Sequence, residues 1–136
     1  DLGFLIKLDT NGTCFDNLVE LVNENLLDYV ALDYKAPQYK FYEVTQSNRF
    51  EEFEKTLCFL INSKIYFEVR TTIHTDLLDD EDINFMINDL HSKGYKNNYY
   101  LQRFLDTTHN IGNIHKEITP FPKDSIRKDL LNIVFR

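Results

Sequence analysis

The apolar residues of this chain switch repeatedly between short continuous runs and helical spacing, and this switching constrains the fold more than any other feature. The short runs are predicted to be strands, at residues 4–8, 29–32, 65–73, 99–104 and 132–135. Helical spacing separates the first four runs, over residues 15–26, 50–61 and 79–93. Such alternation is typical of β-α-β units, so the pattern predicts an α/β fold.

The lengths of the helical segments predict the direction of the strands. Each segment is about long enough to connect neighbouring parallel strands, and such connections are right-handed almost without exception. We therefore expect a parallel sheet of about five strands with helices on its outer face. A closed eight-stranded barrel needs ~250 residues, and this chain has 136. The prediction is a partial (β/α) barrel or a small open sheet. The strand at residues 4–8 is expected to be buried on both faces of the sheet. A partial barrel also leaves one strand edge without a neighbouring strand.

Local signals predict where the helices begin and end. Thr13 and Asn48, each followed three positions later by an acidic residue, match the start of a capping box. Residues 79–82 place four carboxylates where a helix dipole favours them, and we expect a solvated helix start there. Gly94 is expected to end that helix, and Pro122 to seat a last short helix.

The charge of the chain excludes some classes of partner. Its 22 acidic and 15 basic residues give a formal charge of −7. This charge removes the long-range attraction that nucleic acid or an anionic membrane requires, so we expect neither as a partner. No apolar run approaches the ~18 residues of a membrane span, and no leader pattern is present. We expect a cytoplasmic location and, since the chain opens with Asp1 rather than Met, an internal piece of a longer protein.

The cysteines and histidines do not predict a metal site. Cys14 and Cys58 are too few and too far apart for a disulfide framework or a closed zinc motif, and we expect them on helices as small buried hydrophobic residues. The four histidines lack the close pairing of a metal site, so surface or hydrogen-bonded positions are expected. The acidic run at residues 79–82 lacks the oxygen spacing of a calcium-binding loop.

Polar residues stand at the carboxyl ends of the predicted strands, where ligands bind in parallel α/β folds. Polar residues also occur at strand ends simply because loops begin there. Here, however, polar residues follow four predicted strands, and four such ends are better evidence for a site than one. A suitable ligand would be zwitterionic, with an anionic end for Lys35 or Arg70 and a cationic or metal-associated part for the carboxylates. The candidate residues are Asp9, Thr10, Asn11, Asp33, Lys35, Arg70 and Gln102.

Three segments of the chain carry a resemblance to a known family. They are KLDTNGT at residues 7–13, LLDYVALDYKAP at residues 26–37 and YFEVRTTIHTD at residues 66–76, with LQRF at residues 101–104 as a weaker fourth. In this order they resemble the radical S-adenosylmethionine activating enzymes of glycyl-radical proteins. The greatest resemblance is to the activating protein of anaerobic ribonucleoside-triphosphate reductase, and pyruvate formate-lyase activating enzymes are more distant.

The resemblance implies roles for the residues that follow the first two strands. Asp9, Thr10 and Asp33 match residues that line the methionyl end of S-adenosylmethionine, with Asn11 beside them. In the family these positions can hold a monovalent cation, for which Asp9 and Asp33 are the candidates here.

Lys35 matches the lysine that binds the carboxylate of the cofactor, and Arg70 matches an arginine that helps to orient it. Gln102 and Phe104 match positions near the adenosyl group. A cofactor with one carboxylate, one amine and a sulfonium needs both signs of charge at fixed places. The resemblance therefore implies cofactor-binding residues in this chain but no catalytic residue.

The same resemblance implies the reaction and its partners. In the family a [4Fe-4S] cluster, held by three cysteines in C-x-x-x-C-x-x-C, supplies an electron that cleaves S-adenosylmethionine. The 5'-deoxyadenosyl radical then abstracts hydrogen from a glycine Cα of a partner protein. The implied partners are a glycyl-radical protein, such as anaerobic ribonucleotide reductase, and an electron donor such as flavodoxin or ferredoxin.

The sequence departs from the family where the cluster would bind. The three-cysteine motif is absent, and so is the glycine-rich segment for the amine of the cofactor. We therefore expect residues 1–136 to be the carboxyl-terminal part of a radical S-adenosylmethionine partial barrel, without its amino-terminal cluster-binding part. Such a chain would be inactive as an oxidoreductase on its own.

Two alternatives remain open. The first is a non-catalytic half-barrel that serves as an interaction or assembly module, including self-association through the edge strand at residues 4–8. The second is a barrel enzyme for a small phosphorylated metabolite, which the absence of a glycine-rich phosphate loop disfavours. The aromatic loop of Tyr34, Tyr39, Phe41 and Tyr42 is expected to pack over the sheet, with docking of a partner protein as its functional alternative.

Overall fold

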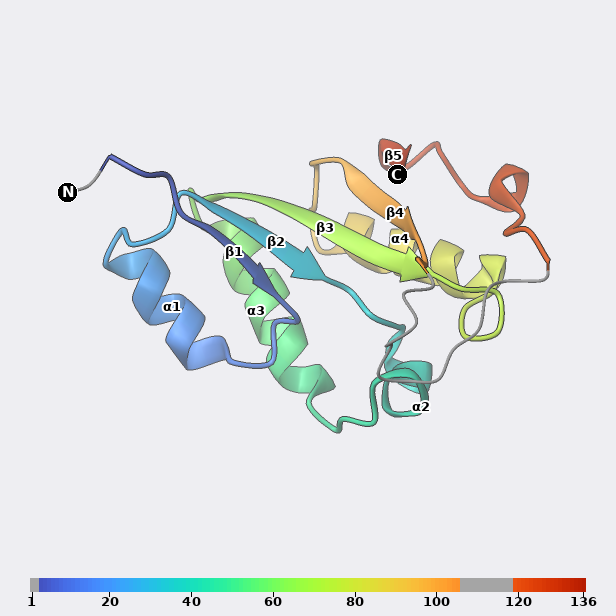
Figure 1. The fold of residues 1–136 in the computed structure, drawn as a ribbon, viewed down its shortest axis with the longest axis horizontal. Helices are drawn as coiled ribbons and strands as arrows, with labels where there is room; N and C mark the ends of the chain where they lie inside the picture. The colour runs from blue at the N-terminus through green and yellow to red at the C-terminus, as the bar shows by residue number, and fades with distance from the viewer. Residues whose placement is uncertain (1–2, 106–118) are drawn as a thin grey trace.

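Five parallel strands form one sheet in the computed structural model, in the order β1-β2-β3-β4-β5 (Figure 1). The structure describes residues 3–105 and 119–136. The strands are β1 (Lys7–Thr10), β2 (Tyr29–Asp33), β3 (Tyr66–Ile73), β4 (Tyr99–Arg103) and β5 (Ile133–Phe135). Every pairing between neighbours is parallel. The predicted α/β fold with a parallel sheet is confirmed, and its architecture is consistent with a partial barrel.

Three helices connect the first four strands and lie on one side of the sheet (Figure 1). They are α1 (Phe15–Asn23), α3 (Phe50–Asn62) and α4 (Asp80–Ser92). The apolar stripes predicted for the second and third helices are buried, because these side chains pack on the sheet. The buried apolar residues are Phe53, Leu57 and Leu60 from α3, and Ile83, Met86, Ile87 and Leu90 from α4. They share one core with strand residues that include Val30, Leu32 and Val69.

The other side of the sheet is polar, and among the described residues no helix covers it (Figure 1). Side chains alternate between the two faces along each strand. Asp33 is in register with Arg70, and Arg70 is in register with Tyr100, so these three residues form a row on the open face. Parallel sheets are usually covered on both faces. This sheet instead presents charged groups on one face, beside the carboxyl ends of its strands.

The first strand begins later than predicted. Phe4, Leu5 and Ile6 precede β1 and are 80%, 85% and 51% exposed, so the expected doubly buried strand at residues 4–8 is wrong. The strand pairing begins at Lys7, opposite Tyr29. An apolar run predicts a strand from composition, but burial also requires a neighbour that covers it. In the described part of the chain, β1 is an edge strand with β2 as its neighbour.

The starts of the first two helices also differ from the prediction. Cys14 and Arg49 are the N-cap residues of α1 and α3, and neither caps the helix with its side chain. Thr13 does not cap α1, because its backbone amide and its hydroxyl both donate to Asn11 Oδ1 within the turn. The capping boxes expected at Thr13 and Asn48 are therefore wrong.

The start and end of α4 agree with the prediction in most respects. Asp79 and Asp82 form a reciprocal capping box at its start. Gly94 follows the helix with φ +89°, and the short helix expected after Pro122 is a single 3-10 turn, η2 (Lys123–Ser125). The expectation that this helix start is solvated is wrong for Asp82, which is 2% exposed.

The cysteines and histidines occupy varied environments. Cys14 is exposed and Cys58 is half-buried, so the expected burial is wrong for Cys14, which precedes α1 instead of lying in its apolar stripe. His74 is buried and its Nδ1 accepts a hydrogen bond from the Asp76 amide, whereas His91 is exposed. The remaining two histidines lie outside the described residues.

In the part of the chain that the structure describes, no helix has the length and apolar character needed to cross a membrane.

Candidate functional site

A chain of alternating charges crosses the open face from β1 over β2 to β3. Arg70 lies between two carboxylates: its Nη2 is 3.4 Å from Asp9 Oδ2, and its Nε donates to Asp33 Oδ1. Asp33 Oδ2 accepts a hydrogen bond of 2.9 Å from Lys35 Nζ. At the other end, Asp9 Oδ1 is 3.3 Å from Lys7 Nζ. The structure therefore brings Asp9, Asp33, Lys35 and Arg70 together.

The sheet register explains this cluster, because parallel pairing places Asp33 directly opposite Arg70. Desolvation would raise the pKa of Asp9, but Arg70 and Lys7 outweigh it and lower that pKa below its ordinary value of 3.8. Desolvation would lower the pKa of Arg70, while its contacts with Asp33 and Asp9 raise it. Asp9 and Arg70 are therefore both charged at neutral pH.

The two carboxylates that are candidates for a monovalent cation already have protein partners. The Arg70 guanidinium contacts both Asp9 and Asp33, and a lysine contacts each carboxylate from the other side. Within residues 3–105 and 119–136, no group of three His, Cys, Asp or Glu side chains is arranged to hold a metal ion.

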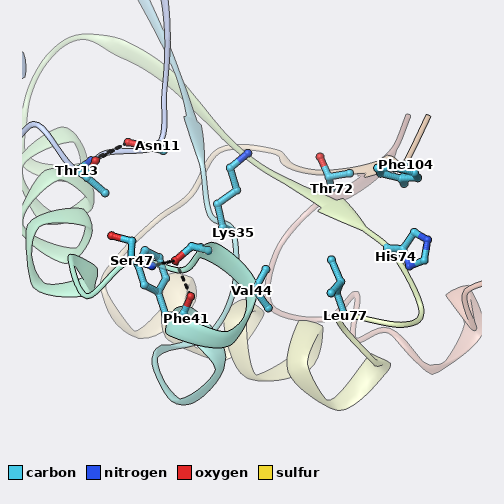
Figure 2. Close-up of a pocket in the computed structure, with 11 residues that line it drawn as sticks. Asn11, Thr13, Lys35, Phe41, Val44, Ser47, Thr72, His74, Leu77 and Phe104 are labelled. Carbon is cyan, nitrogen blue, oxygen red and sulfur yellow. Dashed lines mark hydrogen bonds between the residues drawn. The ribbon is translucent and has the colours of Figure 1, made fainter. Parts of the chain in front are cut away.

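A pocket of about 410 Å³ opens beside the charged cluster, at the carboxyl ends of β1 to β4 (Figure 2). Lys35 is a cationic residue among the described residues that line the pocket, and its ammonium also pairs with Asp33. Such a pocket suits a ligand with an apolar or aromatic body and an anionic end. The pocket is lined by Asn11, Thr13, Lys35, Phe41, Val44, Thr45, Ser47, Thr72, His74, Leu77 and Phe104.

The two sides of the pocket differ in character. Figure 2 shows Asn11 and Thr13 on one side, Thr72 and Phe104 on the other, and Lys35 between them. The Phe104 ring meets the imidazole of His74 edge to face, with 5.1 Å between the ring centroids. Polar groups therefore line one side of the pocket, and an aromatic pair forms part of the other.

A short helical segment forms the third wall of the pocket, where the sequence predicted only an aromatic loop. It consists of η1 (Gln38–Lys40) and α2 (Phe41–Thr45). Tyr34 and Phe41 are buried, as expected for packing over the sheet, but Tyr39 and Tyr42 are 61% and 57% exposed. Phe41 and Val44, three positions apart, both line the pocket. That helical spacing is the signal that could have revealed the wall.

Thr10 and Gln102 belong neither to the charged cluster nor to the lining of this pocket. Thr10 Oγ1 accepts a hydrogen bond of 3.0 Å from the Gly12 amide and so shapes the turn after β1. Gln102 faces a second hollow of about 630 Å³, which shares Thr72 and Phe104 with the pocket. Of the eight candidate residues, four therefore form the charged cluster, and Asn11, Lys35 and Phe104 line the pocket.

A comparison with known proteins shows significant similarity to a relative from an archaeon. It is a protein of Methanocaldococcus jannaschii named "Putative glycyl-radical enzyme activating enzyme", and it is 35% identical over 86 residues. The match covers 60% of this chain and 36% of the relative, so the chain spans little more than a third of that protein. No protein-family model and no solved structure matches the chain. The similarity supports the resemblance to glycyl-radical enzyme activating enzymes, without singling out one glycyl-radical partner.

Proposed function

We propose that this chain is the carboxyl-terminal part of the partial barrel of a radical S-adenosylmethionine activating enzyme. The intact protein would generate a glycyl radical on a partner protein, as the name of the M. jannaschii relative suggests. The segments at residues 7–13, 26–37 and 66–76 favour anaerobic ribonucleotide reductase as that partner. A flavodoxin or ferredoxin as the electron donor and a cytoplasmic location belong to the same proposal.

The position of Lys35 is the observation that carries the proposal. Its ammonium lines the pocket and pairs with Asp33, at the end of the charged cluster. S-adenosylmethionine combines a carboxylate, two cationic groups and an adenine ring, so it needs both signs of charge beside an apolar surface. We assign Lys35 to the carboxylate of this ligand, and Asp9 and Asp33 to its cationic part. Phe104 lies where an adenine ring could stack.

The residues of this chain do not fit the [4Fe-4S] cluster. Three cysteines are required, but the chain has two, of which Cys14 is exposed and Cys58 is half-buried on α3. We therefore assign the cluster to another part of the intact protein and expect this chain to be inactive alone. When bound, S-adenosylmethionine supplies the radical chemistry. The residues described here would bind it and orient it.

Calorimetric titration of the chain with S-adenosylmethionine tests the proposal. We expect binding, and we expect Lys35→Ala and Asp33→Ala each to weaken it at least tenfold, as loss of a charge-assisted hydrogen bond of about 1.5–3 kcal/mol implies. The same variants in the full-length enzyme should show the same loss. Lys64→Ala is the matched control, because Lys64 precedes β3 at the opposite end of the sheet. Equal affinity in all of these proteins would contradict the assignment.

A second candidate function rests on the segment before β1. Phe4 and Leu5 are 80% and 85% exposed beside an edge strand. Exposed apolar side chains next to unpaired strand groups favour association with another strand. We propose, as the alternative, a non-catalytic half-barrel that associates with a second copy through this edge.

A further inference from the structure

The helical wall of the pocket, formed by η1 and α2, is attached to α4 by a buried carboxylate. The Asp82 side chain on α4 is 3% exposed and accepts hydrogen bonds from Lys40 Nζ at 2.6 Å and from the Tyr39 hydroxyl at 2.7 Å. It also accepts from the Asp79 amide at 3.0 Å, as part of the capping box. Lys40 and Tyr39 belong to η1, which leads directly into α2. The carboxylate thus ties the pocket wall to α4.

The wall needs such attachment because α2 has only five residues. A helix this short is not stable without tertiary contacts. At its first residue, the Phe41 ring packs against Phe50 and Phe53 of α3, with centroid distances of 5.3 and 6.3 Å. The wall is therefore fixed at α3 by an aromatic cluster and at α4 by Asp82.

Lys40 also reaches the facing side of the pocket. Its Nζ lies 3.5 Å from the carbonyl oxygen of Leu77. Leu77 lines the pocket, in the connection between β3 and α4. The ammonium group of Lys40 therefore contacts both α4 and the Leu77 segment. The backbone of Lys40 leads directly into α2. Neither Lys40 nor Asp82 lines the pocket.

We propose that Lys40 and Asp82 are positioning residues that set the separation of α2 from the Leu77 segment, and thereby the affinity of the pocket for its ligand. The identity of that ligand, S-adenosylmethionine, rests on the proposed function. The positioning role rests on the contacts themselves. Removing one partner of a buried ion pair leaves the other charge buried and uncompensated, which is strongly destabilising. Loss of the Lys40 ammonium should therefore weaken the attachment of η1 and α2 to α4.

The first test measures the wall directly. Lys40→Met keeps most of the aliphatic stem and removes the ammonium. We expect hydrogen-exchange protection of the amides at residues 41–45 to fall at least about tenfold, because local opening becomes easier. Lys40→Arg keeps the charge and should retain most of the protection. Unchanged exchange at residues 41–45 in Lys40→Met would overturn the proposal.

The second test measures the ligand. We expect Lys40→Met to weaken binding of S-adenosylmethionine about fivefold, in the range seen for residues that act on a site without touching the ligand. Lys40→Arg should restore the affinity, which a general loss of stability would not explain. Lost protection with unchanged affinity would overturn the positioning role. If the unaltered chain does not bind S-adenosylmethionine, the proposed function fails, while the exchange experiment still decides whether the pair holds the wall.

Asp79→Ala is the matched control for both measurements. It removes the acceptor for the Asp82 amide in the capping box but breaks no hydrogen bond to Lys40 or Tyr39. We expect faster exchange in the first turn of α4 and little change at residues 41–45. An equal loss of protection at residues 41–45 would show that the stability of α4, and not the Lys40–Asp82 pair, holds the wall.

Discussion

The hydroxyl of Thr56 donates a buried hydrogen bond of 2.7 Å to the carbonyl oxygen of Gly12. Thr56 lies on α3, and Gly12 lies in the turn after β1, between two residues that line the pocket. The glycine has φ +75° and packs tightly against the side chains of Leu32 and Phe53. This bond therefore attaches the turn that carries Asn11, on one side of the pocket, to helix α3.

Substitution of Gly12 by alanine should destabilise the chain by about 3 kcal/mol, because a strained backbone and an overpacked site each cost about 1–3 kcal/mol. An added Cβ would lie 2.8 Å from Leu32 Cδ1 and 3.1 Å from Phe53 Cδ2. Gly94→Ala is the control, because Gly94 has φ +89° but its nearest neighbour would be 4.0 Å from the new Cβ. Urea unfolding measures both variants. Equal losses would show that the close packing around Gly12 is unimportant.

Substitution of Thr56 by valine should lower the free energy of unfolding by about 2 kcal/mol, because it leaves the buried Gly12 carbonyl without its partner. Valine keeps nearly the same shape, so the loss reports the hydrogen bond. Thr56→Ser keeps the hydroxyl and removes only a methyl group. If the serine variant is the less stable of the two, packing and not the hydrogen bond dominates at this position.

Removal of the Arg70 guanidinium should change the titration of Asp9. Desolvation raises the pKa of Asp9, but attraction to Arg70 and then to Lys7 outweighs it and holds the pKa below 3.8. In Arg70→Gln we expect that pKa to rise, as measured by NMR titration of the side-chain carboxyl carbon. Lys64→Gln removes a distant charge and should leave it unchanged. No difference between the two variants would contradict the ion pair.

Asp82 should make stability depend on acid pH. Burial would raise its pKa, but hydrogen bonds from Lys40, the Asp79 amide and Tyr39 outweigh it, so the pKa is below 3.8. The folded state therefore binds fewer protons than the unfolded state, and the stabilisation is present above about pH 4–5 and lost as pH falls below it. We expect the free energy of unfolding to drop less between pH 5 and 3, roughly the window of that loss, in Asp82→Asn than in the unaltered chain. Urea unfolding at both pH values measures this, and equal slopes would contradict it.

Association through the β1 edge should depend on the exposed apolar segment. Leu5 is 85% exposed, and Leu5→Lys places a charge there, a device that opposes edge pairing. Light scattering over a range of concentrations should show an apparent mass that rises for the unaltered chain and stays monomeric for this variant. Tyr66→Lys, at a side chain that is 78% exposed at the start of β3, is the control. A strict monomer at every concentration would refute the second candidate function.

The features that follow from local pattern and chain length could be predicted from the sequence. The spacing of Phe53, Leu57 and Leu60 predicts the buried face of α3, since one apolar stripe must pack on the sheet. The lengths of the connections predict parallel strands, and parallel strands share one end. The placement of Asp33 beside Arg70 therefore agrees with the pattern, although the two residues are distant in sequence.

The features that depend on contacts between distant segments could not be predicted in this way. Asp82 resembles the other carboxylates at the start of α4, and its burial requires η1 to bring Lys40 and Tyr39 across from more than forty positions away. Phe4 and Leu5 have the composition of a buried strand, but no described element covers them. The apolar spacing within one segment does not show which distant residues will contact it, or whether any will.

Lys35 lines the pocket and also pairs with Asp33, and this double contact bears on which ligands the pocket would favour. The Lys35 ammonium donates to the Asp33 carboxylate, so an anionic ligand would share this group with the protein. A ligand that also carries a positive group would interact favourably with Asp33 while its anionic end contacts Lys35, whereas a simple anion would place a second negative charge beside that carboxylate. We therefore expect the charged cluster to favour ligands that carry both signs of charge over simple anions.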